Sequence, residues 1–340
     1  MKKVAIIGQY GKSQDYLTGQ AVKTTTCADW MIQKYGESNV MIINSFGWKN
    51  HPVRLLKEVV QAMAQCKNIM VFPATNGIEV FPSLLAALNK IYHRKLFLVV
   101  IGGWLGDFCE RKRRLRHAVA SFDNVLAETD ALASQLRQLG IVASTLPNFR
   151  SFKQALPKDQ ANHHVCTYSR VTKTKGIDDA LAIVKKANAL LGKDIFFLDV
   201  YGKIDQAYEE EFIDMCKKEK DIMHYGGAIL EDAKLTVLQK QFAILFPTFY
   251  EGECFPGTAL DAFETKTPII ANDWKYIREI IRDGENGLIY PFRDTTVASS
   301  KLVALYQDPM LYQKIQEGCS QSCQAYDTAR LLEETCKNMA

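Results

Sequence analysis

Short apolar runs recur along the whole chain with helical patterns between them, and this alternation restricts the fold more than any other feature. Near-continuous apolar strands separated by helices indicate a parallel sheet that is covered on both faces. The first half of the chain is therefore predicted to form an α/β domain of the Rossmann-like kind. Its strands are expected at residues 4–8, 40–44, 68–74, 95–103, 124–129 and 142–148.

The pattern stops at residues 149–164, where apolar periodicity is lost and Pro157 stands among polar residues. Such a segment is typical of a linker between domains. We predict an N-terminal domain over 1–150, a linker over 151–164, and a second domain over 165–325. A last helix within 326–340 is expected to pack back on the first domain.

The pattern then restarts, which predicts a second Rossmann-like domain. Its strands are expected at 164–170, 195–202, 222–227, 242–249 and 267–273, and its helices at 176–192, 205–219, 233–240 and 257–265. In open α/β sheets, ligands bind outside the carboxyl ends of the strands. Two such domains that face each other across a cleft would place a ligand between them.

Composition excludes several classes of function. The chain has 42 basic and 38 acidic residues among 340, and this small excess of positive charge does not predict a nucleic-acid partner. No window reaches about 18 consecutive apolar residues, so no membrane span is expected. The nine scattered cysteines indicate a reduced, cytoplasmic protein. No histidine or cysteine set has the spacing of a metal site, so we expect neither metal nor cofactor.

Two cations stand where a strand runs into a helix. Arg170 and Lys175 precede a helix that Gly176 opens. Backbone N–H groups and the positive end of a helix dipole attract anions, and nearby cations strengthen the attraction. The stretch therefore predicts a diphosphate site. The alternative is a solvated loop with two ordinary surface cations.

The segment FPTFYEGECFPGTALDAF, residues 246–263, holds three acids after a buried-looking strand. Glu251, Glu253 and Asp261 have no lysine or arginine close to them in the sequence. Carboxylates without cations suit sugar and ribose hydroxyls, because each oxygen can accept a hydrogen bond. The alternative is that Asp261 only complements the helix dipole and that Glu251 is a solvated loop acid.

Together these motifs resemble the signature of glycosyltransferase family 4, whose members are retaining enzymes with two Rossmann-like domains across a cleft, the GT-B fold. The likeness covers essentially the whole chain. Two departures are that Asp261 replaces the family's second Glu and that the turn GGWLGDF lacks a histidine found in many relatives. The matching stretches are Pro247 with Thr248, ECFPGTALD (253–261), Arg170 and Lys175 with Gly176, LPNF (146–149) and TGQAVKT (18–24).

The resemblance implies that Arg170 and Lys175 hold the donor diphosphate and that Glu253 contacts the donor sugar, and these three are its catalytic residues. Asp261 would bind the nucleotide ribose. The resemblance also implies that the N-terminal domain is the acceptor side and that the C-terminal domain binds the nucleotide-sugar donor. It further places Gly19, Cys254, Phe255 and Pro256 in the donor site. The implied activity is metal-independent, retaining transfer of a hexose from a nucleotide-diphosphate sugar, a UDP-sugar, to a polysaccharide or lipid-linked saccharide.

Four other functions are alternatives to this one. A nucleotide-sugar epimerase of the same fold and a transferase with a soluble acceptor remain open. A dinucleotide-dependent oxidoreductase is disfavoured because residues 8–19 lack a G-x-G-x-x-G fingerprint. A catalytically inert partner subunit is disfavoured because Arg170, Lys175 and Glu253 are all present.

The segment ERKRRLRHAVASF, residues 110–122, predicts one amphipathic helix with a basic face formed by Arg111, Lys112, Arg113, Arg114 and Arg116. Cations near an anionic surface favour binding to it. We therefore expect a peripheral enzyme on the inner face of the plasma membrane. The alternative is a core-packed helix with a solvated charged face.

Overall fold

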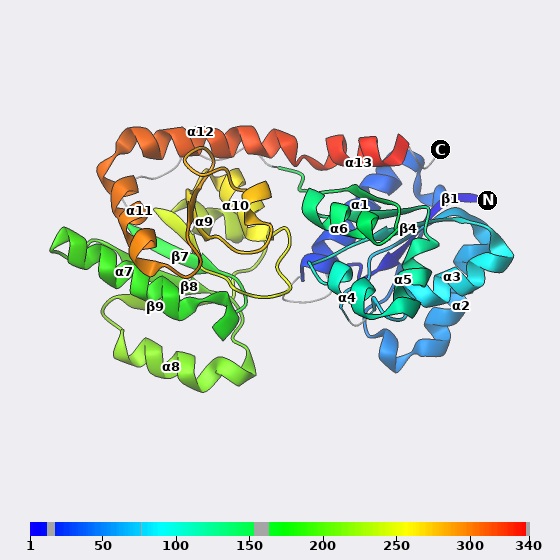
Figure 1. The fold of residues 1–340 in the computed structure, drawn as a ribbon, viewed down its shortest axis with the longest axis horizontal. Coiled ribbons are helices and arrows are strands. Elements are labelled where there is room, and N and C mark those ends of the chain that lie inside the picture. The colour runs from blue at the N-terminus through cyan, green and yellow to red at the C-terminus, as the bar shows by residue number, and fades with distance from the viewer. Residues whose placement is uncertain (12–17, 76, 153–162, 338–340) are drawn as a thin grey trace. The chain divides into compact units, whose positions relative to one another are not determined.

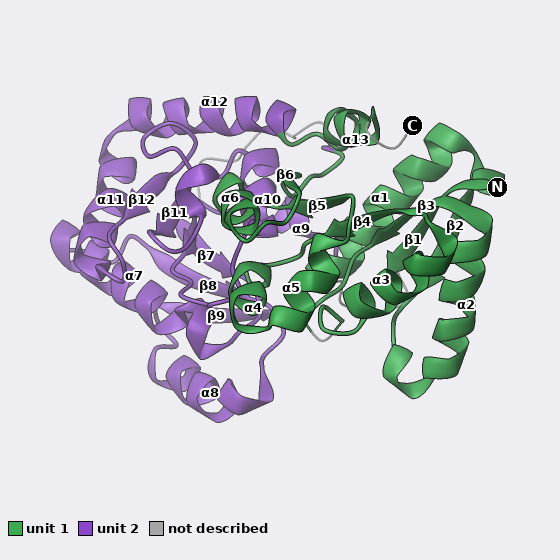
Figure 2. Ribbon diagram, turned by 45° about the vertical axis from the view of Figure 1, so that its right-hand side comes forward, with its two compact units in different colours: residues 1–151, 326–340 green, residues 152–325 purple. Residues whose placement is uncertain are grey.

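The computed structural model describes residues 1–11, 18–75, 77–152 and 163–337. They form two compact units, which Figure 2 shows in different colours. Unit 1 comprises Met1–Ser151 and Tyr326–Ala340, and unit 2 comprises Phe152–Ala325. Most of the predicted linker, residues 153–162, lies outside the described part of the chain, as do residues 12–17 of the stretch that lacks a dinucleotide fingerprint.

A six-stranded parallel sheet forms the centre of unit 1, in the order β2-β1-β3-β4-β5-β6. Val4, Ala5, Ile6 and Ile7 of β1 are fully buried, because side chains on both faces of this strand lie under helices. The continuous apolar run in the sequence predicts this environment. The strands are β1 (Lys2–Gly8), β2 (Val40–Asn44), β3 (Cys66–Val71), β4 (Lys95–Val99), β5 (Asn124–Ala127) and β6 (Ala143–Thr145).

The helices of unit 1 follow these strands, and α3 packs against both α2 and α5. Their bounds are α1 (Gly19–Tyr35), α2 (Pro52–Gln65), α3 (Phe81–Tyr92), α4 (Leu105–Arg111), α5 (Arg113–Ala120), α6 (Asp130–Gln138) and α13 (Thr328–Lys337).

The last helix, α13, packs against α1 within unit 1 (Figure 1). Leu332 and Cys336 are buried in the core between α13, α1 and the sheet. Glu333 accepts a hydrogen bond from Lys34 at 2.5 Å. The strand-like pairing of Arg150 with Asp327 holds the start of this helix. The core of unit 1 is thus built from both ends of the described chain.

Unit 2 contains a second six-stranded parallel sheet, in the order β12-β11-β10-β7-β8-β9. Helix α7 packs against α11, and α10 packs against α9 and α12 (Figure 1). The strands are β7 (His164–Tyr168), β8 (Phe197–Tyr201), β9 (Met223–Gly227), β10 (Ala243–Phe246), β11 (Ile269–Asn272) and β12 (Leu288–Tyr290). The helices are α7 (Ile177–Leu191), α8 (Glu209–Lys218), α9 (Lys234–Gln239), α10 (Gly257–Thr265), α11 (Thr295–Gln307) and α12 (Pro309–Ala325). The predicted α/β class with two Rossmann-like sheets is confirmed.

One strand was not predicted, and one helix prediction is wrong. The predicted strands of the second domain did not include β12, which has three residues. The helix expected over 110–122 is two helices, because Lys112 has a non-helical backbone (φ −116°, ψ 88°) between α4 and α5. Leu115 and Val119 of α5 are buried in unit 1, so the apolar side of this helix belongs to the core.

Among the described helices, none combines the length and apolar character needed to cross a bilayer.

Candidate functional site

The predicted site residues of unit 2 lie where β7 and β10 end, and a glycine allows the two exits to approach. After β7 the chain forms a short 3-10 turn, η3 (Lys173–Lys175), and Gly176 then begins α7 with φ +73°. A Cβ atom on Gly176 would lie 2.4 Å from the carbonyl oxygen of Pro247. Only glycine therefore fits at this position, on grounds of both conformation and space.

Arg170 and Lys175 meet on the ring of Tyr250. The Arg170 guanidinium carbon lies 5.6 Å from the ring centroid, and Lys175 Nζ lies 5.1 Å from it. Arg170 is exposed, and its side chain forms no ion pair or hydrogen bond with the residues that the structure describes. Its charge is thus available to a ligand. Sequence reasoning missed Tyr250, for which the only signal was an aromatic residue beside the acidic turn.

Glu253 is held by one of its two carboxylate oxygens. Oε2 accepts from Lys175 Nζ at 2.5 Å and from Thr248 Oγ1 at 3.2 Å. The Lys175 and Glu253 side chains are only 11% and 16% exposed. Oε1 accepts no hydrogen bond within the described part of the chain. The carboxylate is therefore fixed in orientation and keeps one oxygen for another donor.

The expectation of uncompensated carboxylates is wrong, because each of the three acids has a lysine partner from another element. Besides the Lys175–Glu253 pair, Lys275 Nζ lies 2.7 Å from Glu251 and Lys234 Nζ lies 3.1 Å from Asp261. Neighbours in the sequence could not reveal these contacts. Asp261 and Lys234 are each only 3% exposed. The structure thus brings Arg170, Lys175 and Glu253 together, and it places Asp261 in a separate buried ion pair.

The remaining predicted donor residues form the turn before α10 and the start of α1. Cys254 and Phe255 are buried, and Pro256 caps α10, so this turn offers mainly its backbone to a ligand. In unit 1, Gly19 is the first residue of α1 and is exposed, and the Thr18 side chain caps this helix by accepting from Ala21 N.

The stretch TGQAVKT (18–24) also contributes Lys23 to a buried ion pair that sequence reasoning missed. Lys23 Nζ lies 2.8 Å from Glu128 Oε1, with side-chain exposures of 1% and 5%. The other oxygen of Glu128 accepts from the backbone N–H of Gly102 at 3.2 Å. The available signal was a lysine among small residues of a helix and an acid at a strand end. This pair joins α1 to the exits of β4 and β5.

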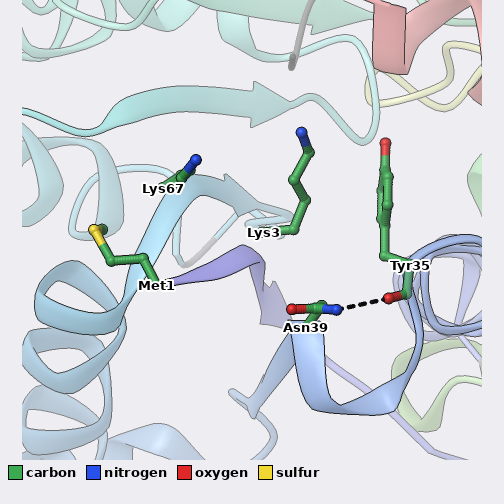
Figure 3. Close-up of a pocket in the computed structure, with 5 residues that line it drawn as sticks. All are labelled: Met1, Lys3, Tyr35, Asn39 and Lys67. Carbon is green, nitrogen blue, oxygen red and sulfur yellow. Dashed lines mark hydrogen bonds between the residues drawn. The ribbon is translucent and has the colours of Figure 1, made fainter.

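A separate hollow of about 240 Å³ lies in unit 1, beside the amino ends of β1 and β3. Figure 3 shows its lining residues, with the Asn39 side chain donating to the Tyr35 carbonyl oxygen at 2.9 Å. The sequence motifs fall instead at carboxyl ends of strands, where open α/β sheets bind ligands. This hollow is therefore not the candidate site. Within the described residues, no group of three or more His, Cys, Asp or Glu side chains could hold a metal ion.

Comparison with known proteins gives a family and a fold. A family model for glycosyl transferases group 1 matches residues 148–321, slightly more than half of the chain. The phosphatidyl-myo-inositol mannosyltransferase of Mycobacterium leprae is 30% identical over 76 residues, which are 22% of this chain and 20% of that protein. The chain therefore aligns with about a fifth of this relative's length.

Two solved structures align over nearly the whole chain. Anabaena HepE in complex with UDP aligns with a TM-score of 0.78 and 13% identity, covering 100% of this chain and 99% of that one. Sucrose-phosphate synthase from Thermosynechococcus elongatus aligns with a TM-score of 0.75 and 13% identity, covering 99% and 98%. At this identity the likeness establishes the two-domain α/β fold of the GT-B class.

Proposed function

The chain belongs to the family of glycosyl transferases group 1, and from this premise we propose that it transfers a hexose from a UDP-sugar to a saccharide acceptor with retention of anomeric configuration. The structure of HepE with bound UDP supports the choice of donor. The observation that carries the proposal is the meeting of Arg170 and Lys175 on Tyr250, with Glu253 held beside them.

In this assignment the two cations and the start of α7 bind the donor diphosphate. As the bond between the sugar C1 and the phosphate oxygen breaks, the leaving diphosphate gains negative charge. Fixed positive groups at that position stabilise the transition state more than the ground state. Arg170, which has no carboxylate partner among the described residues, supplies a full positive charge, and Lys175 supplies a second whose charge Glu253 partly balances.

Glu253 orients the donor sugar. Its Oε1 accepts a sugar hydroxyl while Lys175 and Thr248 hold Oε2. The acceptor hydroxyl attacks C1 from the face of the leaving group, so a new C–O bond forms on that face and the configuration is retained. The acceptor proton passes to the leaving phosphate oxygen, and this step requires no protein nucleophile. The ribose hydroxyls are assigned to Asp261, and further donor contacts to Gly19 and the turn of Cys254, Phe255 and Pro256.

Two lysines of the same turn provide the test. Lys175→Met removes the cation of the proposed clamp, and Lys173→Met removes a lysine that pairs with Glu211 and is 62% exposed. Losing one charged group at a developing anion lowers turnover by about 10²-fold or more. We expect that loss for Lys175→Met, and a rate near that of wild type for Lys173→Met.

The assay is hydrolysis of UDP-, GDP- and ADP-sugars by the purified protein, with melting curves for every variant. We expect release of UDP, and activity that persists in EDTA. Equal turnover of the two lysine variants would show that the clamp is assigned wrongly. Conversion of the donor to its epimer without nucleotide release would favour the epimerase.

For the acceptor, we propose a lipid-linked or polysaccharide precursor at an anionic membrane on the cytoplasmic side. Arg111, Arg113, Arg114 and Arg116 remain a cationic group on α4 and α5, and Lys112 is paired with Glu79. Because the apolar side of α5 packs in the core, attraction would be electrostatic, at about 1 kcal/mol for each cation near the surface.

Sedimentation with phosphatidylglycerol liposomes tests this. The protein should sediment at low salt and be released near roughly 0.5 M salt through screening. Arg113→Glu with Arg114→Glu should abolish sedimentation, and Arg330→Glu on α13 should leave it unchanged. Indifference to lipid charge and salt would favour a soluble acceptor.

A further inference from the structure

Two aromatic rings stack at the carboxyl edge of the unit 2 sheet. The centroids of Trp274, after β11, and Phe292, after β12, lie 5.0 Å apart, with an angle of 27° between the planes. Phe292 is 52% exposed. A large ring left in water on an ordered turn loses the stabilisation that burial would bring. The stack therefore leaves the Phe292 ring largely open to solvent at this edge of the sheet.

The stack is joined directly to the turn that holds Glu253. Trp274 Nε1 donates to the carbonyl oxygen of Tyr250 at 2.9 Å, and the backbone N–H of Glu253 donates to the same oxygen at 3.0 Å. One carbonyl therefore fixes both the indole and the proposed sugar-binding acid. A ring that stacks here lies on the same sheet edge as the reaction centre.

Phe292 is held in place by the residue that follows it. Arg293 has φ +55°, which is uncommon for a residue other than glycine. Its backbone N–H donates to Asn272 Oδ1 at 2.9 Å, and its guanidinium binds Asp179 through two hydrogen bonds of 2.8 and 3.0 Å. The same guanidinium lies 4.4 Å from the Phe249 ring centroid. The exposed ring is thus presented by a fixed backbone.

Polar groups border the aromatic surface. Lys275 Nζ lies 5.3 Å from the Trp274 ring centroid and forms an ion pair of 2.7 Å with Glu251, whose side chain is 59% exposed. A pyranose ring combines a face of C–H groups with a rim of hydroxyls. The C–H face suits an aromatic ring, and the hydroxyls suit an exposed ammonium and carboxylate.

We propose that Phe292 and Trp274 form a platform that stacks a pyranose ring of the acceptor saccharide, with Lys275 and Glu251 contacting its hydroxyls. The inference rests on the proposed function, because it assigns the acceptor of the same reaction. The platform is separate from the proposed donor site, because none of its four residues is assigned to the diphosphate or to the donor sugar.

The test compares Phe292→Ala with Phe292→Tyr, which keeps the ring. Phe292 is used rather than Trp274 because its side chain does not hold the Glu253 turn. Donor hydrolysis without acceptor is measured first, and then transfer to a panel of p-nitrophenyl hexosides. We expect the alanine variant to raise the acceptor KM about tenfold, as for loss of one stacking contact, with unchanged donor hydrolysis and UDP affinity. The tyrosine variant should match wild type.

Each contrary result has its own meaning. An unchanged acceptor KM in Phe292→Ala, or no transfer by wild type to any hexoside although it hydrolyses the donor, would overturn the platform and leave the proposed function standing. A weakened UDP affinity in Phe292→Ala would overturn it in favour of nucleobase stacking. Failure of wild type to hydrolyse any nucleotide sugar would count against the proposed function, and with it the platform.

Discussion

Lys234 Nζ lies 3.1 Å from Asp261 Oδ1, and both residues are almost completely buried. Lys234 Nζ also binds Glu231 Oε1 at 2.7 Å, so Lys234 keeps a carboxylate partner when Asp261 is removed. Asp261→Ala is therefore expected to raise the Kd for UDP, and to lower the free energy of unfolding by less than the about 3–5 kcal/mol that breaking an isolated buried pair costs. Chemical denaturation and calorimetric titration measure the two effects separately.

A double variant separates the ribose role from stability. Lys234→Met with Asp261→Leu replaces both charges by apolar side chains and should recover most of the stability. If Asp261 binds ribose, this variant should fold well and still have a low affinity for UDP. Affinity at the wild-type level would show that the assignment to ribose is wrong.

Arg170 is a charge whose removal leaves no described residue unpaired. Arg170→Ala should lower turnover by about 10²-fold or more, with an unchanged melting curve. Arg282→Ala, which removes an exposed arginine paired with Glu285, is the matched control and should be neutral. Near-normal transfer by Arg170→Ala would contradict the diphosphate clamp.

The Lys23–Glu128 pair predicts a stability defect in unit 1. Lys23→Met should destabilise the protein by about 3–5 kcal/mol because Glu128 then keeps a buried charge without its cation. Adding Glu128→Gln keeps an acceptor for the Gly102 N–H and removes the charge, so part of the stability should return. Urea denaturation of the three proteins measures this. Equal stability of Lys23→Met and wild type would mean that solvent reaches the carboxylate.

Buried thiols predict a loss of stability in alkaline solution. Burial raises the pKa of Cys109 from 9.0 to about 12 and that of Cys336 from 9.0 to about 11. Both thiols stay protonated in the folded chain while the unfolded chain ionises above pH 9. The folded state therefore binds more protons, and its stability, complete below pH 9, falls as pH rises through these pKa values.

Denaturation midpoints at pH 8, 9.5 and 10.5 check this expectation. The midpoint should stay constant to about pH 8.5 and then fall, in line with the linkage between pKa and stability. Cys109→Ala should show a smaller fall over the same range than wild type. If the denaturation midpoint of Cys109→Ala falls as much as that of wild type, groups other than Cys109 cause the loss of stability.

The elements that sequence predicted well are those whose signal is local. Continuous apolar runs such as 4–8 indicate strands covered on both faces, and the order of motifs indicated where the site residues stand. The lysine partners of Glu251, Glu253 and Asp261 could not be predicted, since each comes from another element. The break at Lys112 was missed because it does not interrupt the pattern of apolar residues, and β12 was missed because its apolar run has only three residues.

The packing of α13 on α1 also bears on the order in which the chain folds during synthesis. Leu332 and Cys336 belong to the core of unit 1, yet they are made after every residue of unit 2. Domains generally fold as units while the chain is still being made. Unit 2 can therefore acquire its full set of contacts first. Unit 1 is therefore begun first and completed last. Until α13 has been made, the part of unit 1 that it covers has no packing partner.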